Sequence, residues 1–191
     1  MKLGILTGGG DCPGLNPVIR AAVKTALQEG FEVFGIHNGW KGLVEADIKP
    51  LDASSVSGIL HRGGTILGTS RTNPFKDKGA LEKLKANFKK FGLDALIAIG
   101  GEDTLGVANK LYQEGLKIVG VPKTIDNDLI LPNHYPSFGF ETARYVGTKI
   151  VDTLMVDAKT TKRWFLVTSM GRKAGFLALG LGIASRIALA R

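Results

Sequence analysis

The fold is decided by residues 95–121, which read ALIAIGGEDTLGVANKLYQEGLKIVGV. The continuous apolar run over 95–99 is typical of a buried parallel strand. A helix is predicted from Leu105 to Glu114, and a second strand from Lys117 to Val121. A strand, a helix and a strand in this order form a unit whose two strands lie parallel, so this stretch predicts an α/β fold.

The same alternation continues on both sides of this unit. The other strands are predicted over 3–7, 32–36 and 163–168, and the other helices over 16–28, 77–91, 141–157 and 174–190. Repeated units of this kind build one parallel sheet with helices on both faces. We therefore predict a Rossmann-like parallel sheet sandwiched by helices.

The composition is that of one globular domain with its own core. The chain has 191 residues, of which 44% are hydrophobic and 22% charged, and its formal net charge is +8. This positive charge fits either a solvated basic face or an acidic partner, such as a phosphorylated metabolite. No RNP box, zinc finger or basic zipper is present, so nucleic acid is not an expected partner.

Cysteine content and hydropathy indicate the compartment. Cys12 is the only cysteine, so the chain can form neither an internal disulfide nor a cysteine-based metal cluster, and a reducing cytoplasm is expected. No apolar run reaches the length of about 18 residues that a membrane span needs, and the start of the chain does not resemble an export signal. We expect a cytoplasmic protein with no membrane partner.

Four polar loops follow predicted strands. They are Gly8-Gly9-Gly10-Asp11, Gly100-Gly101-Glu102-Asp103-Thr104, Pro122-Lys123-Thr124-Ile125-Asp126-Asn127-Asp128 and Ser169-Met170-Gly171-Arg172. In open α/β sheets ligands bind beyond the carboxyl ends of the strands, which is where all four loops belong. Their convergence on one edge of the sheet predicts an enzyme.

The two glycine-rich loops are suited to phosphate. A glycine turn before a helix offers backbone N–H groups and the positive end of the helix dipole to an anion, although a purely structural tight turn is the alternative. The loop at 8–14 is neither a Walker A motif nor a dinucleotide fingerprint. The acids Glu102 and Asp103 suggest Mg²⁺ held between carboxylates and phosphate oxygens. Their alternative role is to stabilise a helix N-terminus.

The loop over 122–128 contains the groups that phosphoryl transfer needs. These are a carboxylate to take a hydroxyl proton, a second carboxylate for Mg²⁺ and a cation for the phosphate, supplied by Asp126, Asp128 and Lys123. In an extended loop the two aspartates alternate, so both could point into one cleft. A turn rich in Asp and Asn is the alternative.

Together these residues resemble the phosphofructokinase family, which phosphorylates fructose 6-phosphate at its 1-hydroxyl. The matching blocks run in family order over nearly the whole chain: 9–16, 63–65, 100–104, 122–128 and 170–172. The resemblance implies a magnesium-dependent transferase of glycolysis that gives fructose 1,6-bisphosphate. It also implies a homo-oligomer, because Arg163 resembles the arginine that reaches a neighbouring subunit's sugar-phosphate site.

The resemblance also implies a role for each matching residue. Asp126 is expected to be the general base, with Arg172 and the Gly10 amide stabilising charge on the phosphoryl group. Asp128 is expected to assist at the metal, for which Glu102 is the expected ligand. The other sugar-phosphate contacts are expected from Thr124, Arg163, Met170 and Gly171. The other donor contacts are expected from Trp40, Arg71, Gly101, Asp103, Thr104 and Lys123.

Two positions indicate the phosphoryl donor. Members that use ATP typically carry glycine at the positions of Asp103 and Lys123, whereas members that use pyrophosphate resemble this chain. A carboxylate about 4 Å from the α-phosphate of ATP would cost about 4 kcal/mol at an effective dielectric of 20. Lys123 supplies a point charge suited to a small, highly charged donor. Pyrophosphate is the expected donor, with ATP as the alternative.

The family extends beyond the length of this chain. Its members continue into a second α/β lobe that supplies further sugar-phosphate ligands. Residues 1–191 therefore resemble the N-terminal, donor-binding lobe, and the sequence ends within a predicted helix, as a truncated chain would. The remaining alternative is a truncated, catalytically silent lobe that binds phosphate.

Overall fold

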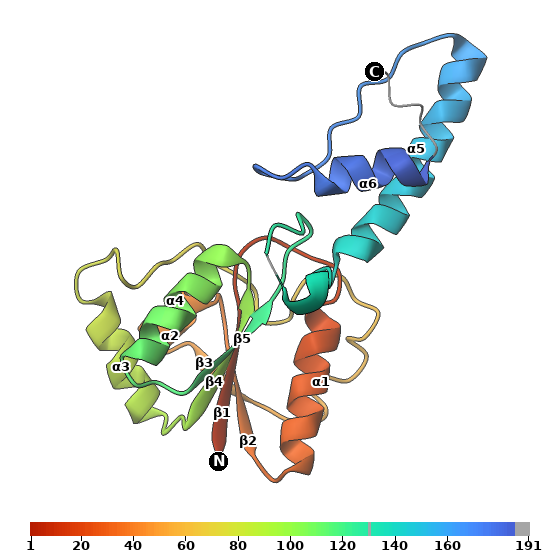
Figure 1. Cartoon of the computed structure of the whole chain (residues 1–191). Coiled ribbons are helices and arrows are strands. Elements are labelled where there is room, and N and C mark those ends of the chain that lie inside the picture. The colour runs from red at the N-terminus through yellow and green to blue at the C-terminus, as the bar shows by residue number, and fades with distance from the viewer. Residues whose placement is uncertain (130, 186–191) are drawn as a thin grey trace. The chain divides into compact units, whose positions relative to one another are not determined.

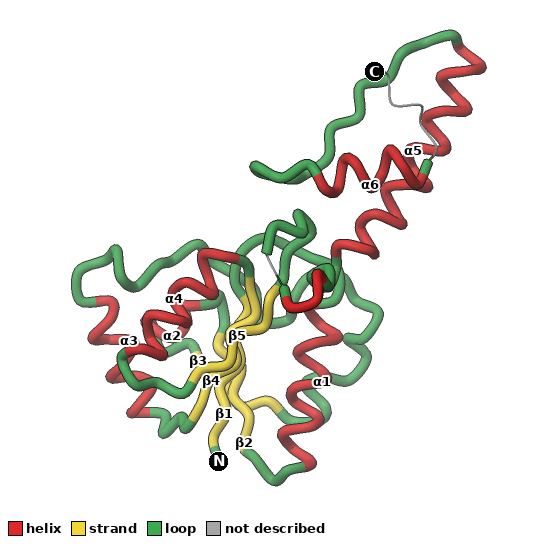
Figure 2. Tube along the Cα trace, viewed as in Figure 1, coloured by secondary structure: helices red, strands yellow, loops and turns green. Residues whose placement is uncertain are grey.

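The computed structural model describes residues 1–129 and 131–185, and the chain divides into two compact units. The N-terminal unit spans Met1–Lys123 and the C-terminal unit spans Thr124–Arg191. Figures 1 and 2 show the elements of each unit. The boundary falls within the loop over 122–128, so Lys123 and Asp126 belong to different units.

The N-terminal unit is built on a five-stranded sheet with the strand order β3-β2-β1-β4-β5. Its strands are β1 (Lys2–Thr7), β2 (Glu32–Ile36), β3 (Ile48–Leu51), β4 (Ala95–Gly100) and β5 (Ile118–Pro122). All neighbours are parallel except β3, which runs antiparallel to β2. In the central strand Ile5 lies opposite Gly35 of β2 and Ile97 of β4. The predicted α/β fold is confirmed.

Helices cover both faces of this sheet (Figure 1). One face carries α1 (Leu15–Gln28), and the other carries α2 (Trp40–Glu45), α3 (Ala80–Lys90) and α4 (Glu102–Gln113). Strand side chains such as Leu6 and Leu96 are fully buried against them. Because α4 starts directly after Gly101, it begins three residues before the predicted start at Leu105.

The elements α2 and β3 were not predicted. The helix α2 is a single short segment, and β3 contains Pro50, which lacks the N–H that a ladder needs. Proline is tolerated in a strand at the edge of a sheet, and β3 is an edge strand. Its pairing with β2 is decided by tertiary contact, for which the local sequence carries no periodic signal.

A long loop over 52–79 joins β3 to α3 and contains no helix or strand (Figure 2). At its start the Asp52 carboxylate accepts hydrogen bonds from the Ser54 hydroxyl at 2.7 Å and from the Ser55 hydroxyl and N–H, each at 2.7 Å. These donors, the Ser54 hydroxyl above all, lower the pKa of Asp52 from 3.8 to about 2.

This turn should make stability depend on pH in acid. Because the pKa of Asp52 is lower in the folded state, its hydrogen bonds stabilise the fold fully above about pH 4 and are lost as the pH falls through about 2. Asp52→Asn should therefore lower the urea midpoint at pH 6, and its difference from the wild type should shrink towards pH 2. A difference that stays constant between these pH values would contradict this assignment.

Over residues 124–129 and 131–185, the C-terminal unit contains a short 3₁₀ turn (Pro132–His134) and two helices, α5 (Phe140–Thr161) and α6 (Phe176–Ala184). Phe140 of α5 packs with Leu177 and Leu181 of α6 in a small core. A Cβ on Gly147 would lie 2.5 Å from Leu181, so glycine at this position allows the close approach of α5 and α6. The predicted helix over 141–157 is confirmed and is longer at both ends.

Two predictions for this unit differ from the structure. The predicted strand over 163–168 is wrong, because this segment is irregular and exposed and Trp164 is fully accessible. An isolated apolar run becomes a strand only when a neighbouring strand takes up its backbone hydrogen bonds, and local sequence does not supply that neighbour. The helix predicted over 174–190 corresponds to α6, and its last residues, 186–190, lie outside the described residues.

Over the described ranges 1–129 and 131–185, no helix combines the length and the apolar character that crossing a bilayer demands.

Candidate active site

The candidate donor site lies at the carboxyl ends of β1 and β4, the adjacent strands from which the sheet extends in opposite directions. From β1 the chain adds β2 on one side, and from β4 it adds β5 on the other. Such a switch in strand order leaves a crevice in which ligands bind. The Gly8 N–H donates to Ile99 O at 2.9 Å, and the Lys123 N–H donates to Gly100 O at 2.9 Å. These bonds fix the loops after β1, β4 and β5 side by side.

Thr104 packs between the two glycine-rich loops. It is 5% exposed, and a Cβ on Gly8 would lie 2.4 Å from its Oγ1, while a Cβ on Gly100 would lie 2.5 Å from its Cβ. Both glycines are therefore required by the Thr104 side chain. Sequence analysis predicted Thr104 as a donor contact, and the described structure gives its side chain a packing role between the loops.

A methyl group on Gly8 should destabilise the fold. Gly8→Ala places its Cβ against Thr104, and overpacking of this kind costs about 1–3 kcal/mol, measurable by urea unfolding. Gly10→Ala is the matched control, because a Cβ on Gly10 meets no atom within 4 Å. Thr104→Ala should restore much of the stability lost in Gly8→Ala. Equal destabilisation by the two glycine substitutions would refute the proposed packing.

Lys123 provides a buried cation beside the first glycine turn. Its side chain is 4% exposed, and its Nζ donates a hydrogen bond to Gly10 O. A Cβ on Gly9 would lie 3.5 Å from the same Nζ, so the ammonium group lies against the Gly9–Gly10 backbone. Gly10 itself is exposed. The arrangement places a buried positive charge directly behind an exposed glycine backbone, a combination suited to a phosphate group.

Glu102 and Asp103 form the first turn of α4, and both are exposed. The positive end of the helix dipole favours these carboxylates. Across the described residues, no three His, Cys, Asp or Glu side chains lie close enough together to enclose a metal ion. These side chains therefore do not provide enough ligands to hold a metal ion by themselves. They fit Mg²⁺ shared between one or two carboxylates and the phosphates of a substrate.

Trp40 and Arg71 have contrasting environments. Trp40 is 2% exposed in the main core, packed among residues such as Leu6 and Leu43, and its indole N–H has no hydrogen-bond partner among the described residues. Arg71 is exposed within the 52–79 loop. Of these two predicted donor contacts, only Arg71 presents its side chain to solvent.

Asp126 lies in the C-terminal unit and is 6% exposed. Its N–H donates to Thr124 Oγ1 at 3.0 Å, which folds Thr124 to Asp126 into a local turn. Ser137, which sequence analysis did not single out, lies beyond this turn in the chain and holds it by two hydrogen bonds. Its hydroxyl donates to Thr124 O at 2.6 Å, and its N–H donates to Asn127 Oδ1 at 3.1 Å. A lone serine has no motif by which the sequence could have revealed it.

The expectation of an extended loop with both aspartates pointing the same way is not met. Asn127 adopts a left-handed conformation with φ 53°, which asparagine tolerates better than most residues. The backbone therefore does not alternate as a strand does. Asp126 is buried and Asp128 is exposed.

The remaining predicted residues lie in the irregular segment between α5 and α6. Arg163, Met170 and Arg172 are exposed, and Gly171 is partly buried. A Cβ on Gly171 would lie 2.2 Å from Ala174 O, so the tight turn at this position requires glycine. Arg172 has φ 49°, in the left-handed region.

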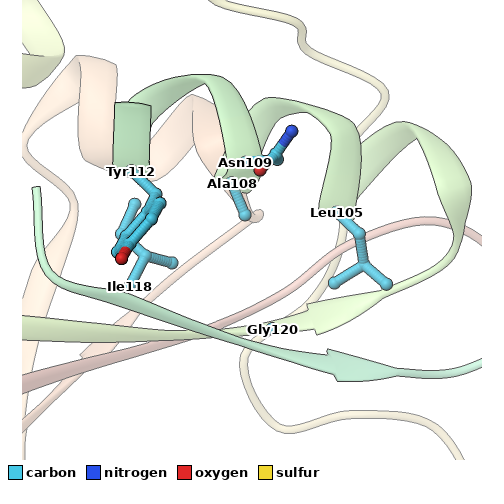
Figure 3. A pocket seen from close by; sticks show the side chains of 6 residues that line it. All are labelled: Leu105, Ala108, Asn109, Tyr112, Ile118 and Gly120. Carbon is cyan, nitrogen blue, oxygen red and sulfur yellow. The ribbon is translucent and has the colours of Figure 1, made fainter. Parts of the chain in front are cut away.

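A pocket of about 280 Å³ lies elsewhere, between α4 and the edge strand β5 (Figure 3). It is lined by Leu105, Ala108, Asn109, Tyr112, Ile118 and Gly120. None of these side chains carries the positive charge that a phosphate needs. The pocket marks the open edge of the sheet, and we do not assign the phosphate site to it.

Comparison with known proteins agrees with this geometry. The phosphofructokinase family model matches residues 2–190. The chain is 52% identical over 185 residues to the pyrophosphate–fructose 6-phosphate 1-phosphotransferase of Amycolatopsis methanolica, covering 96% of this chain and 54% of that protein. It is 49% identical over 186 residues to ATP-dependent 6-phosphofructokinase 3 of Streptomyces coelicolor, covering 97% and 54%.

A solved structure supports the same relationship. The phosphofructokinase structure from Saccharomyces cerevisiae superposes with a TM-score of 0.84 at 32% identity, covering 95% of this chain and 28% of that one. The chain spans about half the length of the curated relatives it matches.

Proposed function

This chain belongs to the phosphofructokinase family, and from that premise we propose that it transfers a phosphoryl group from pyrophosphate to the 1-hydroxyl of fructose 6-phosphate. The products are fructose 1,6-bisphosphate and orthophosphate. The observation that carries the proposal is the buried Lys123 ammonium against the Gly9–Gly10 backbone.

The choice of donor depends on charge. Pyrophosphate is small and densely charged, and Lys123 places a cation close to an accessible glycine backbone to receive it. Asp103, exposed on the first turn of α4, opposes the additional α-phosphate of ATP by like-charge repulsion. The relative that acts with pyrophosphate is also slightly more similar to this chain than the relative that acts with ATP. An ATP-dependent enzyme remains the second candidate because of that small difference.

Chemistry at the acceptor is proposed for residues of the C-terminal unit, together with the Gly10 N–H of the N-terminal unit. Asp126 accepts the proton of the sugar 1-hydroxyl. At the same time the hydroxyl oxygen bonds to phosphorus, and the bridging P–O bond of pyrophosphate breaks. Arg172 and the Gly10 N–H stabilise the charge on the transferring group. Thr124, Arg163, Met170 and Gly171 bind the sugar phosphate, and Asp128 orients the loop.

Mg²⁺ would be held by Glu102 together with the donor phosphates, and when bound it would neutralise part of their charge. We further propose that residues 1–191 form the donor-binding lobe of a cytoplasmic homo-oligomer.

The proposal is tested by supplying both donors side by side. Fructose 1,6-bisphosphate formation is measured with Mg²⁺ and either pyrophosphate or ATP at equal concentration, in wild type and in Lys123→Met. Faster turnover with pyrophosphate, lost in Lys123→Met, is the expected result. Turnover with ATP alone would support the second candidate, and Lys83→Met, on the exposed side of α3, controls for loss of a positive charge.

A further inference from the structure

Two buried polar side chains outside the predicted site form hydrogen bonds with residues of the 52–79 loop. The first is Thr7, the last residue of β1, which is fully buried. Its hydroxyl donates to Gly68 O at 2.8 Å and lies 2.9 Å from Thr65 Oγ1. The single proton of the Thr7 hydroxyl is used by Gly68 O, so the Thr65 hydroxyl is the donor in the hydrogen bond between the two threonines. Thr65 Oγ1 also accepts from the Leu67 N–H at 3.1 Å.

The second is Asn16, in the first turn of α1, with 2% of its surface exposed. Its Nδ2 donates to Arg62 O at 3.0 Å and to Gly63 O at 3.3 Å, and its Oδ1 accepts from the Ile66 N–H at 2.8 Å. Both hydrogens of the side-chain amide and its oxygen are therefore used by one short stretch of loop. A reversed amide would place its oxygen against two carbonyl oxygens, so these partners fix its orientation.

These bonds bring the loop to the carboxyl end of β1. A Cβ on Gly39 would lie 2.9 Å from Thr7 O, 3.7 Å from Ser70 N and 3.8 Å from Gly8 Cα. The backbone at Ser70 therefore runs close to the point where the first glycine turn begins. The next residue along the chain is Arg71.

We infer that Thr7 and Asn16 are positioning residues that hold segment 62–71 against the glycine turn and so preform the place of Arg71 for the phosphoryl donor. They lie at the two ends of the turn that contains Gly10, so the same turn anchors the loop backbone that leads to Arg71. The inference rests on the proposed function. Its physical basis is preorganisation, because a loop without helix or strand would otherwise lose conformational entropy when the donor binds.

The positional effect is tested by amide hydrogen exchange. The Ile66 amide, held by Asn16 Oδ1, should exchange at least about tenfold faster in Asn16→Ala, and the 65–68 amides should exchange faster in Thr7→Val. Thr7→Val keeps the shape of the side chain and suits a buried strand, so it remains informative if Asn16→Ala fails to fold. Unchanged exchange in both variants would overturn the inference.

The functional effect is tested by calorimetric titration with magnesium pyrophosphate. Each variant should bind about tenfold more weakly than wild type. In an Arg71→Ala background the same substitutions should have little further effect, because they act through Arg71. If the losses of affinity in the Thr7 and Asn16 variants simply add to the loss in Arg71→Ala, these two residues have a merely structural role and the inference is overturned.

Asn87 is the matched control. Its Nδ2 donates to Leu43 O and Val44 O, both at 2.9 Å, so it also joins an amide side chain to two carbonyl groups. It connects α3 to the end of α2, and Asn87→Ala should lower stability without changing pyrophosphate affinity. If wild type binds pyrophosphate and the Thr7 and Asn16 variants bind equally well, only this inference fails. If wild type does not bind pyrophosphate, the proposed donor fails and this inference with it.

Discussion

Asp126→Asn is expected to reduce the rate of phosphoryl transfer to fructose 6-phosphate by a factor of about 10²–10⁴, the usual contribution of a general base. Asparagine matches aspartate in shape but cannot take the hydroxyl proton. The turn itself should persist, since the hydrogen bond to Thr124 Oγ1 comes from the backbone of residue 126. Initial rates of fructose 1,6-bisphosphate formation provide the measurement.

Two control measurements show whether the loss of rate is specific to the base. Pyrophosphate affinity, measured by calorimetry, should not change, because Lys123 and Gly10 are intact. Asp152→Asn on the exposed side of α5 removes the same charge and should leave the rate unaltered. A rate within about twofold of wild type would exclude Asp126 as the base. Turnover by the 191-residue chain itself, abolished in Asp126→Asn, would eliminate the catalytically silent lobe.

Asp103→Gly combined with Lys123→Gly is expected to shift donor preference towards ATP, by at least about tenfold in the ratio of kcat/KM values. A like charge about 4 Å away costs about 4 kcal/mol at an effective dielectric of 20. Asp103 is exposed, so solvent and salt reduce that cost, and the tenfold expectation allows for this screening. The measurement is kcat/KM for each donor at fixed fructose 6-phosphate and Mg²⁺.

The burial of Lys123 calls for a second variant. Because the side chain is 4% exposed, Lys123→Gly leaves a cavity that lowers stability as well as removing charge. Asp103→Gly with Lys123→Met removes the same charges while keeping most of the volume, and it should shift the preference in the same direction. If pyrophosphate remained the sole donor in both double variants, the electrostatic account of donor choice would be wrong.

The sequence was most informative about the site where a loop follows a strand. Gly100 to Thr104 and Lys123 were found because their strands have continuous apolar runs that end at glycine or proline. It was least informative about single polar residues. Thr7, Asn16 and Ser137 hold loops through hydrogen bonds to residues that are distant in the sequence, such as Gly68, and no local motif marks such a partner.

Except for α2, β3 and the segment 163–168, the chain by itself determined the order of strands and helices, because hydrophobic periodicity is a local property that each segment carries. It also determined the family, through motifs read from contiguous residues. Tertiary structure alone decided that 163–168 is irregular, that β3 pairs with β2, and that Asp126 is buried while Asp128 is exposed. Each of these outcomes depends on hydrogen-bond partners or on a φ value that packing selects, and neither is encoded by the residue's immediate neighbours.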